Sequence, residues 1–389
     1  MTPTELEPIL KRRNSAIGKV LKVKSEPAVA FGENYTSDIY RASVLIQETT
    51  GEVKTINVII KCGVLKEYKQ AIVSEMGLFE TEIKMYTEIL PRMEEILKKH
   101  LPGEEGFGPR CLGSRADDRI VLEDLKPEGY EMADRLKKLS LSQAKKVLQY
   151  LARFHAASYV LKEKGLLDVS QLKKFFLAEE NYRYCNELFK ANILEFSKVI
   201  DEFWGEEWKE LSYRVQRLAT EQLEKVAKAC EVDESAFNVL NHGDLWVNNI
   251  LFKSSENGSV QSIKFIDFQI CHYNSPSIDL QYFFHTSIPL SCLKKNYDDL
   301  LETYYIELQD NLRTLNGARV DRFTLEDLKR DMEAKSYIGL SVVVLLAPYI
   351  CGNGVEVEEG NKAAAMYRVE GVEECLKEAL PEFLRRGLL

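Results

Sequence analysis

Several features that would mark a special class of protein are missing from this sequence of 389 residues. Positive charge is not in excess: 52 Lys and Arg against 61 Asp and Glu give a formal net charge of −9, so no basic field favours nucleic acid or an anionic membrane. The longest apolar run, residues 337–351, is shorter than the ~20 residues of a membrane span and contains Pro348. We read it as a buried helix and predict no nucleic-acid and no membrane partner.

Secretion signals and cysteine motifs are missing as well. Glu5 and Glu7 occupy the N-terminal stretch, where a secretory signal has basic and then apolar residues, so we expect a cytoplasmic protein. The eight cysteines form no C-x-x-C pair, which predicts reduced thiols rather than a disulfide framework. Cys271 and His272 with His285 and Cys292 match no common zinc-finger spacing, so we predict no zinc site.

What is present is the composition of a globular protein, with 45% hydrophobic and 29% charged residues. Apolar runs at residues 27–30, 40–47, 55–62 and 120–122 predict a small antiparallel sheet, and an amphipathic pattern over 74–90 predicts one helix, ended by Pro91. The chain leaves this sheet near residues 122–128, and helical patterns then dominate. We therefore predict an α+β protein divided into residues 1–125 and 126–389.

The most informative stretch is a loop and hairpin that carry three polar side chains. Asp244 and Asn249 lie on the loop, and Asp267 follows a predicted hairpin whose strands are joined through Asn257-Gly258. An antiparallel pairing brings Asn249 and Asp267 to one end of the hairpin, and two hard oxygen ligands suit Mg²⁺ better than zinc. Asp244 is free to accept a proton from a hydroxyl that attacks phosphorus. The H-x-D-x-x-x-x-N spacing matches the catalytic loop of the protein-kinase-like fold.

A lysine and a glutamate in the N-terminal part extend this pattern. Lys61 ends a buried strand, and a lysine that emerges from such a strand usually needs a partner. Glu82 follows 82 − 61 = 21 residues later and shares a helical face with Phe79 and Tyr86, so we predict an ion pair between Lys61 and Glu82. The same helix also offers Glu80 and Glu88.

Six blocks in series resemble the ecdysteroid kinase-like family of arthropods, relatives of choline kinase and aminoglycoside phosphotransferases. The blocks are residues 32–37, 79–86, 122–125, 151–158, 242–249 and 266–269, and they cover roughly residues 30 to 285. The resemblance implies a two-lobed, protein-kinase-like fold with a nucleotide-binding lobe at 1–125 and a helical lobe at 126–389 that holds the catalytic loop and the substrate pocket. It also implies transfer of phosphate from ATP, with Mg²⁺, to a hydroxyl of a small molecule, ecdysteroids being the known substrate type.

The resemblance assigns further residues to the nucleotide. Residues 32–37 take the place of the phosphate-covering loop, although they hold one glycine where protein kinases have three, and residues 122–125 take the place of the hinge that meets adenine. In this family pattern Lys61 and Glu82 hold the α- and β-phosphates. The other nucleotide candidates are Gly32, Asn34, Ser37, Glu123 and Leu125.

Supporting residues and the substrate class follow from the same comparison. His242 would brace the catalytic loop, Asp279 would hydrogen-bond it, and His155 reads as a core histidine. Only 279 − 268 = 11 residues separate Phe268 from Asp279, which leaves no room for the segment that docks peptides, so we predict a small-molecule substrate.

Aromatic clusters in the helical part would suit a lipophilic alcohol such as a steroid or a xenobiotic, with Trp246 as the first candidate contact because it lies two residues from Asp244. A choline- or aminoglycoside-type kinase and a non-catalytic protein that sequesters a hydrophobic ligand remain alternatives. The sequence makes no prediction of oligomeric state.

Overall fold

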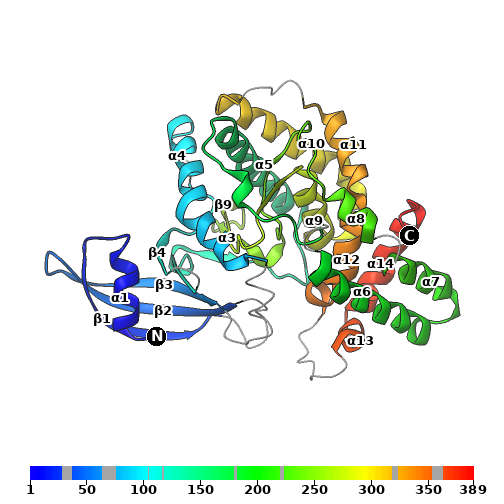
Figure 1. The fold of residues 1–389 in the computed structure, drawn as a ribbon, viewed down its shortest axis with the longest axis horizontal. Coiled ribbons are helices and arrows are strands. Elements are labelled where there is room, and N and C mark those ends of the chain that lie inside the picture. Colours follow the sequence, from blue (N-terminus) through cyan, green and yellow to red (C-terminus); the bar gives the residue numbers. More distant parts are fainter. Residues whose placement is uncertain are drawn as a thin grey trace. The chain divides into compact units, whose positions relative to one another are not determined.

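The chain groups into two compact units in a computed structural model (Figure 1). The structure describes residues 1–28, 37–63, 76–103, 105–115, 118–178, 182–219, 223–317, 323–352 and 362–389. The first unit comprises Met1–Lys98, Gly103–Glu131 and Leu251–Gln269, and the second comprises Lys99–Pro102, Met132–Ile250 and Ile270–Leu389. These units differ from a single division at residue 125, because Leu251–Gln269 joins the N-terminal residues.

The first unit is built on a five-stranded antiparallel sheet in the order β1-β2-β3-β5-β4. Helix α1 (Pro3–Lys11) covers it, with its Leu6, Ile9 and Leu10 in one apolar core with the strands. Helix α1 was not predicted, although Pro3 in the first turn and a capping box from Thr2 are helix-start signals. The strands are β1 (Ile17–Pro27), β2 (Ser37–Glu48), β3 (Val53–Gly63), β4 (Cys111–Arg115) and β5 (Arg119–Glu123).

Strand β1 is not where the sequence predicts it. The prediction placed the first strand at residues 27–30, whereas β1 begins at Ile17 and ends at Pro27. Lys19, Lys22 and Lys24 are exposed along it, because β1 is an edge strand of the sheet. Charged side chains on an edge discourage pairing with other chains, and they also hide the alternation that predicts a strand.

Helix α3 does not end at Pro91, as predicted. After α3 (Leu78–Lys84), a π-helical turn (Met85–Ile89) leads directly into α4 (Leu90–His100), which contains Pro91 near its start. Proline has no N–H to donate to the carbonyl four residues earlier, which belongs to Thr87. The Arg13 guanidinium donates to that carbonyl instead, at 2.9 Å, so the chain continues as a helix.

The predicted hairpin is present as β8 (Ile250–Ser254) and β9 (Val260–Phe265), which share a sheet with β6 (Tyr130–Met132). Its turn has Gly258 at φ +80°. Loop 105–107 anchors β9: Phe107 O accepts the Phe265 N–H at 2.7 Å, and Glu105 accepts the Ser262 hydroxyl at 2.7 Å. These hydrogen bonds attach the hairpin to the first unit.

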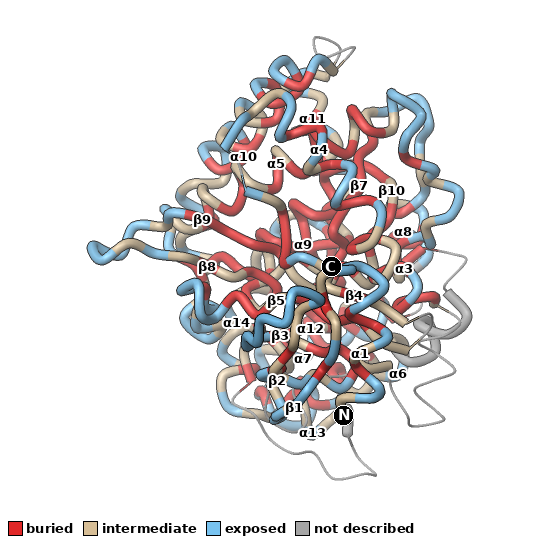
Figure 2. Tube along the Cα trace, turned by 90° about the vertical axis from the view of Figure 1, so that its left-hand side faces the viewer, coloured by how far each residue is buried: buried red, intermediate tan, exposed pale blue. Residues whose placement is uncertain are grey.

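The second unit is mainly helical, so the predicted α+β class with an N-terminal antiparallel sheet is confirmed. Among its described residues, β7 (Val239–Asn241) and β10 (His272–Asn274) form a short antiparallel pair. Helix α9 is buried along most of its length (Figure 2). The helices are α5 (Leu141–Glu163), α6 (Tyr182–Val199), α7 (Lys209–Arg217), α8 (Leu223–Ala229), α9 (Ser277–Ser287), α10 (Leu290–Thr314), α11 (Leu325–Ala334), α12 (Ser336–Cys351), α13 (Lys362–Tyr367) and α14 (Val372–Arg385).

Helix α12 contains the long apolar run and is largely buried, as expected. Within the part of the chain that the structure describes, no single helix has the length and apolar character to cross a membrane. Only α11 and α12 together pass that test, and they are bent by 50° relative to each other.

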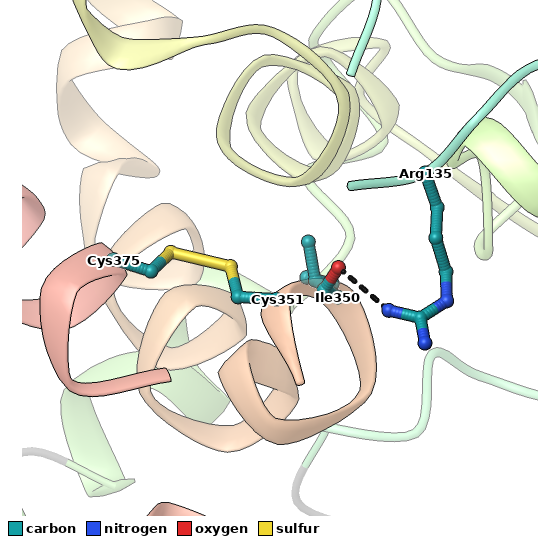
Figure 3. Close-up of a disulfide and its surroundings, with 4 residues drawn as sticks. All are labelled: Arg135, Ile350, Cys351 and Cys375. Atoms are coloured by element: carbon teal, nitrogen blue, oxygen red, sulfur yellow. Dashed lines mark hydrogen bonds between the residues drawn. A yellow bond between two sulfur atoms is a disulfide. The ribbon is translucent and has the colours of Figure 1, made fainter. Parts of the chain in front are cut away.

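A disulfide between α12 and α14 corrects the prediction that the thiols are reduced. Cys351, the last residue of α12, is bonded to Cys375, with their Cα atoms 6.6 Å apart (Figure 3). Arg135 donates to the Ile350 and Gly352 carbonyls at 3.1 and 2.8 Å, which fixes the end of α12. Helix packing rather than a sequence motif brings the two cysteines together, so their spacing gave no signal.

Candidate active site

A buried ion-pair cluster forms around Lys61 in the first unit. Val58 and Ile60 of β3 face the core under α1, so the alternation of the strand turns Lys61 to the opposite face of the sheet. Its Nζ lies 2.7 Å from Glu82 Oε2 and 2.5 Å from Asp267 Oδ1. Lys61 is 5% and Glu82 1% exposed. The structure thus pairs Lys61 with Glu82, and the alternatives Glu80 and Glu88 are exposed.

The charges in this cluster do not balance. Burial lowers the pKa of Lys61, but the carboxylates of Asp267 and Glu82 outweigh it and leave this pKa raised, so the amine stays protonated. Burial raises the pKa of Glu82 to about 7, Lys61 opposes this, and the charge of Asp267 adds to it. One ammonium therefore faces two carboxyl groups, and when both are ionised a further cation at Asp267 would relieve the excess negative charge.

Asp267 has a strained backbone. Its φ is +66°, a left-handed conformation that costs a non-glycine residue roughly 1–2 kcal/mol. The next residue, Phe268, is fully buried, and its ring meets the Tyr86 ring edge-on at 5.3 Å. Packing of Phe268 thus holds Asp267 in this conformation, and backbone strain of this kind concentrates at functional sites.

The loop that carries Asp244 is anchored to α9 in the second unit. The N–H groups of His242 and Gly243 donate to the Asp279 carboxylate at 2.7 and 2.8 Å. Gly243 has φ +85°, and a Cβ atom there would lie 2.3 Å from the Ile270 carbonyl oxygen. His242 accepts the Asp244 N–H on Nδ1 at 3.3 Å. The loop therefore follows a path that only glycine permits at residue 243.

Both oxygens of the Asp244 carboxylate have partners. Asn249 Nδ2 donates to Asp244 Oδ2 at 2.9 Å and to the Asp244 carbonyl at 2.8 Å, and the Tyr282 hydroxyl donates to Oδ1. Because two acceptors face the amide nitrogen of Asn249, the network fixes the orientation of that amide. Its Oδ1 is then the atom left to bind a cation, as a metal ligand requires.

Asp279 belongs to a fully buried network. His155 Nε2 lies 3.1 Å from Asp279 Oδ2, and His155 Nδ1 lies 2.7 Å from the Tyr304 hydroxyl. Burial raises the pKa of Asp279, but the hydrogen bond and charge of His155, with the Gly243 N–H, outweigh it and keep this pKa low. His155 is a core histidine, as expected. Its link to the loop of Asp244 through Asp279 was not predicted, because three separate helices supply the partners.

The contacts of the remaining candidate residues do not indicate a role for them. Ser37 begins β2 and is buried, while Gly32 and Asn34 lie outside the described residues. Glu123 ends β5 and binds Arg110 through its carboxylate at 2.7 Å, and Leu125 is buried. Trp246 is half-buried and packs against an apolar cluster of the C-terminal helices that also contains Tyr282. Sequence reasoning missed Tyr282, although it follows Asp279 by one helical turn.

Comparison with known proteins gives one family. The model of the ecdysteroid kinase-like family matches residues 31–317. A search of curated proteins finds no match. Among solved structures, an ethanolamine kinase from Plasmodium vivax is similar, with 11% identity and a TM-score of 0.42 over 92% of this chain and 82% of that chain. A likeness this distant does not bear on the substrate.

Proposed function

The chain belongs to the ecdysteroid kinase-like family, whose name describes small-molecule kinases, and we propose that it transfers phosphate from Mg²⁺-ATP to a hydroxyl of a lipophilic alcohol, an ecdysteroid or a xenobiotic. The observation that carries the proposal is the buried Lys61 held by two carboxylates. Such a cluster is costly to bury, and a binding protein for an apolar ligand has no use for it.

In the proposed reaction, Asp244 orients the acceptor alcohol and accepts its proton. The alcohol oxygen forms a bond to the γ-phosphorus while the bond from that phosphorus to the bridging oxygen breaks, and ADP leaves. Lys61 offsets phosphate charge, and Glu82 keeps its amine in place. Asn249 and Asp267 would hold Mg²⁺, which neutralises phosphate charge when bound.

The nucleotide contacts follow the family pattern in the same proposal. Residues 32–37 would cover the phosphates, and Glu123 and Leu125 would meet adenine.

A lipophilic acceptor is favoured by what lies beside Asp244 in the second unit. Trp246 follows it by two residues, and Tyr282 touches its carboxylate; both pack against the apolar cluster of the C-terminal helices. Apolar surroundings with few polar groups suit a steroid-like alcohol. Aromatic rings can also bind a quaternary ammonium group, so a choline-type substrate remains the alternative.

The proposal is tested by incubating the protein with Mg²⁺-ATP and a panel of steroid and xenobiotic alcohols, choline and ethanolamine. Mass spectrometry would detect phosphoryl gain of about 80 Da on the acceptor. We expect Asp244→Asn to lower kcat by about 10² to 10⁴ with nucleotide affinity nearly intact. Asp310→Asn, at an exposed residue of α10, is the matched control and should leave kcat unchanged.

The outcomes separate the alternatives. Full turnover by Asp244→Asn would remove Asp244 from the proposed role. Phosphorylation of choline or ethanolamine alone would favour the cationic-substrate kinase, and tight binding of an alcohol without phosphorylation would favour the binding protein.

Trp246→Ala should raise KM for the alcohol, and an unchanged KM would count against Trp246 as a substrate contact.

A further inference from the structure

Helix α9 contacts the catalytic loop through two side chains with different targets. Asp279 accepts hydrogen bonds from the backbone N–H groups of His242 and Gly243. Tyr282, three residues later and therefore on the same face of the helix, donates its hydroxyl to the carboxylate of Asp244. One helix thus fixes both the path of the loop and the side chain that the loop presents.

The Tyr282 ring has little freedom to move away from Asp244. It is 3% exposed and belongs to the large apolar cluster of the second unit, together with Ile278 one turn earlier. Its carbonyl also accepts the Thr286 hydroxyl at 2.8 Å within the helix. A phenol held by packing on a buried helix offers its hydroxyl at a fixed position, unlike a polar group on a mobile surface chain.

The Asp244 carboxylate is therefore held by one group from its own loop and by another from α9. Asn249, on the same loop, binds Oδ2, and Tyr282, from α9, binds Oδ1. Two hydrogen bonds to separate oxygens restrict rotation about both side-chain torsions of Asp244. Asn249 alone would leave the carboxylate tied only to its own loop.

We propose that Tyr282 is a positioning residue for phosphoryl transfer, which holds the Asp244 carboxylate in the orientation in which the acceptor alcohol meets it. The inference rests on the proposed function and adds a residue to it.

The test compares the steady-state kinetics of Tyr282→Phe with those of wild type. We expect kcat to fall about tenfold while KM for ATP changes little, because the Asp244 carboxylate loses the hydrogen bond that fixes its orientation. Tyr367→Phe is the matched control: this tyrosine is also buried in the second unit, donates to the Val344 carbonyl at 3.0 Å, and should leave kcat and KM unchanged. Equal thermal midpoints for the two variants exclude unfolding as the cause.

Three results would overturn the inference. The first is an unchanged kcat in Tyr282→Phe. The second is a lower KM for the alcohol with a higher kcat, which would mean that the Tyr282 hydroxyl competes with the acceptor. The third is the same loss of kcat in Tyr367→Phe, which would indicate a general packing effect.

A measurement without turnover separates this inference from the proposed function. Carboxyl carbons of aspartate, labelled with ¹³C, can be observed by NMR at a fixed pH, and the Asp244 signal is assigned by its loss in Asp244→Asn. Tyr282→Phe should move this signal, because the carboxylate loses a hydrogen-bond donor, even if wild type phosphorylates none of the alcohols tested. An unmoved signal would refute the positioning contact, whereas absence of turnover in wild type would refute only the proposed reaction.

Discussion

At the scale of single residues, Glu82 links the charge cluster to stability. Its pKa is about 7 in the folded protein and near 4.3 in an unfolded chain. Because the folded state binds the proton more tightly, the stabilisation from this group is complete below pH ~4.3 and is lost as the pH rises through 7. Lys61 stays protonated throughout this window, since its pKa is raised.

We therefore predict that Glu82→Gln removes a fall in stability between about pH 5 and 7.5, because glutamine cannot ionise. The check is the thermal midpoint of wild type and variant at both pH values. Glu80→Gln, at an exposed residue of the same helix, should keep the wild-type dependence. If Glu82→Gln keeps it too, ionisation of Glu82 is not coupled to folding.

Two glycines with left-handed backbones provide a matched pair. Gly243 and Gly258 have φ of +85° and +80°, but a Cβ at Gly258 would meet nothing within 4 Å, whereas one at Gly243 would collide with the Ile270 carbonyl. Alanine at either position costs roughly 1–2 kcal/mol from its φ alone. We predict that Gly243→Ala loses at least tenfold more kcat than Gly258→Ala, measured in the phosphoryl-transfer assay; equal losses would show that the collision is relieved without moving the loop.

Residue types and spacings predicted only part of the site. Lys61 and Glu82 were predictable because strand alternation and helical periodicity assign each a face, and the Asp244–Asn249 contact lies within one short loop. Tyr282, His155 and Tyr304 could not be assigned roles from sequence. Their partners come from different helices, and a tyrosine on an apolar helix face has the same pattern whether its hydroxyl meets an aspartate or a carbonyl.

At the scale of helices and strands, clear turn signals and hydrophobic periodicity predicted the elements, and each wrong prediction has a local cause. The hairpin around Gly258 followed its Asn257-Gly258 turn signal. Pro91 misled the prediction because it leaves the Thr87 carbonyl without a donor. Arg13, which is distant in sequence, donates to that carbonyl instead. Strand β1 misled the prediction because exposed lysines on this edge strand hide the apolar alternation.

The disulfide between α12 and α14 should raise the stability of the folded protein. It closes a loop of 24 residues, which corresponds to about 3 kcal/mol of stabilisation through the unfolded state. Cys375→Ser should therefore lower the thermal midpoint under non-reducing conditions, and dithiothreitol should remove the difference from wild type. Cys292→Ser, at a free cysteine, should behave as wild type. Alkylation of both Cys351 and Cys375 in the untreated native protein would contradict the bond.

At the scale of the whole molecule, the chain passes between the two compact units several times. Asn249 lies in the second unit, and Asp267 lies in the first, two residues after β9. The sequence places both beside one hairpin but does not show to which unit the hairpin belongs. That depends on hydrogen bonds from β9 to residues 105–107, which are more than 150 residues away in sequence.

The proposed roles predict how ligand binding shifts the stability of the whole chain. A ligand that binds only the folded protein stabilises it by about 2.7 kcal/mol when its concentration is 100 times Kd. Mg²⁺-ATP should therefore raise the thermal midpoint of wild type, and of Asp244→Asn, which keeps the nucleotide contacts.

In wild type, Mg²⁺-ATP should raise the midpoint more than ATP does in the presence of EDTA. Asp267→Asn should lose this difference, because a carboxamide is a weaker ligand for a hard cation than a carboxylate. Each rise is measured against the same variant without ligand, so that the loss of the Lys61 contact in Asp267→Asn cancels. An equal Mg²⁺-dependent rise in Asp267→Asn would remove Asp267 from the metal site, and a lost rise in Asp244→Asn would place Asp244 at the nucleotide rather than at the acceptor.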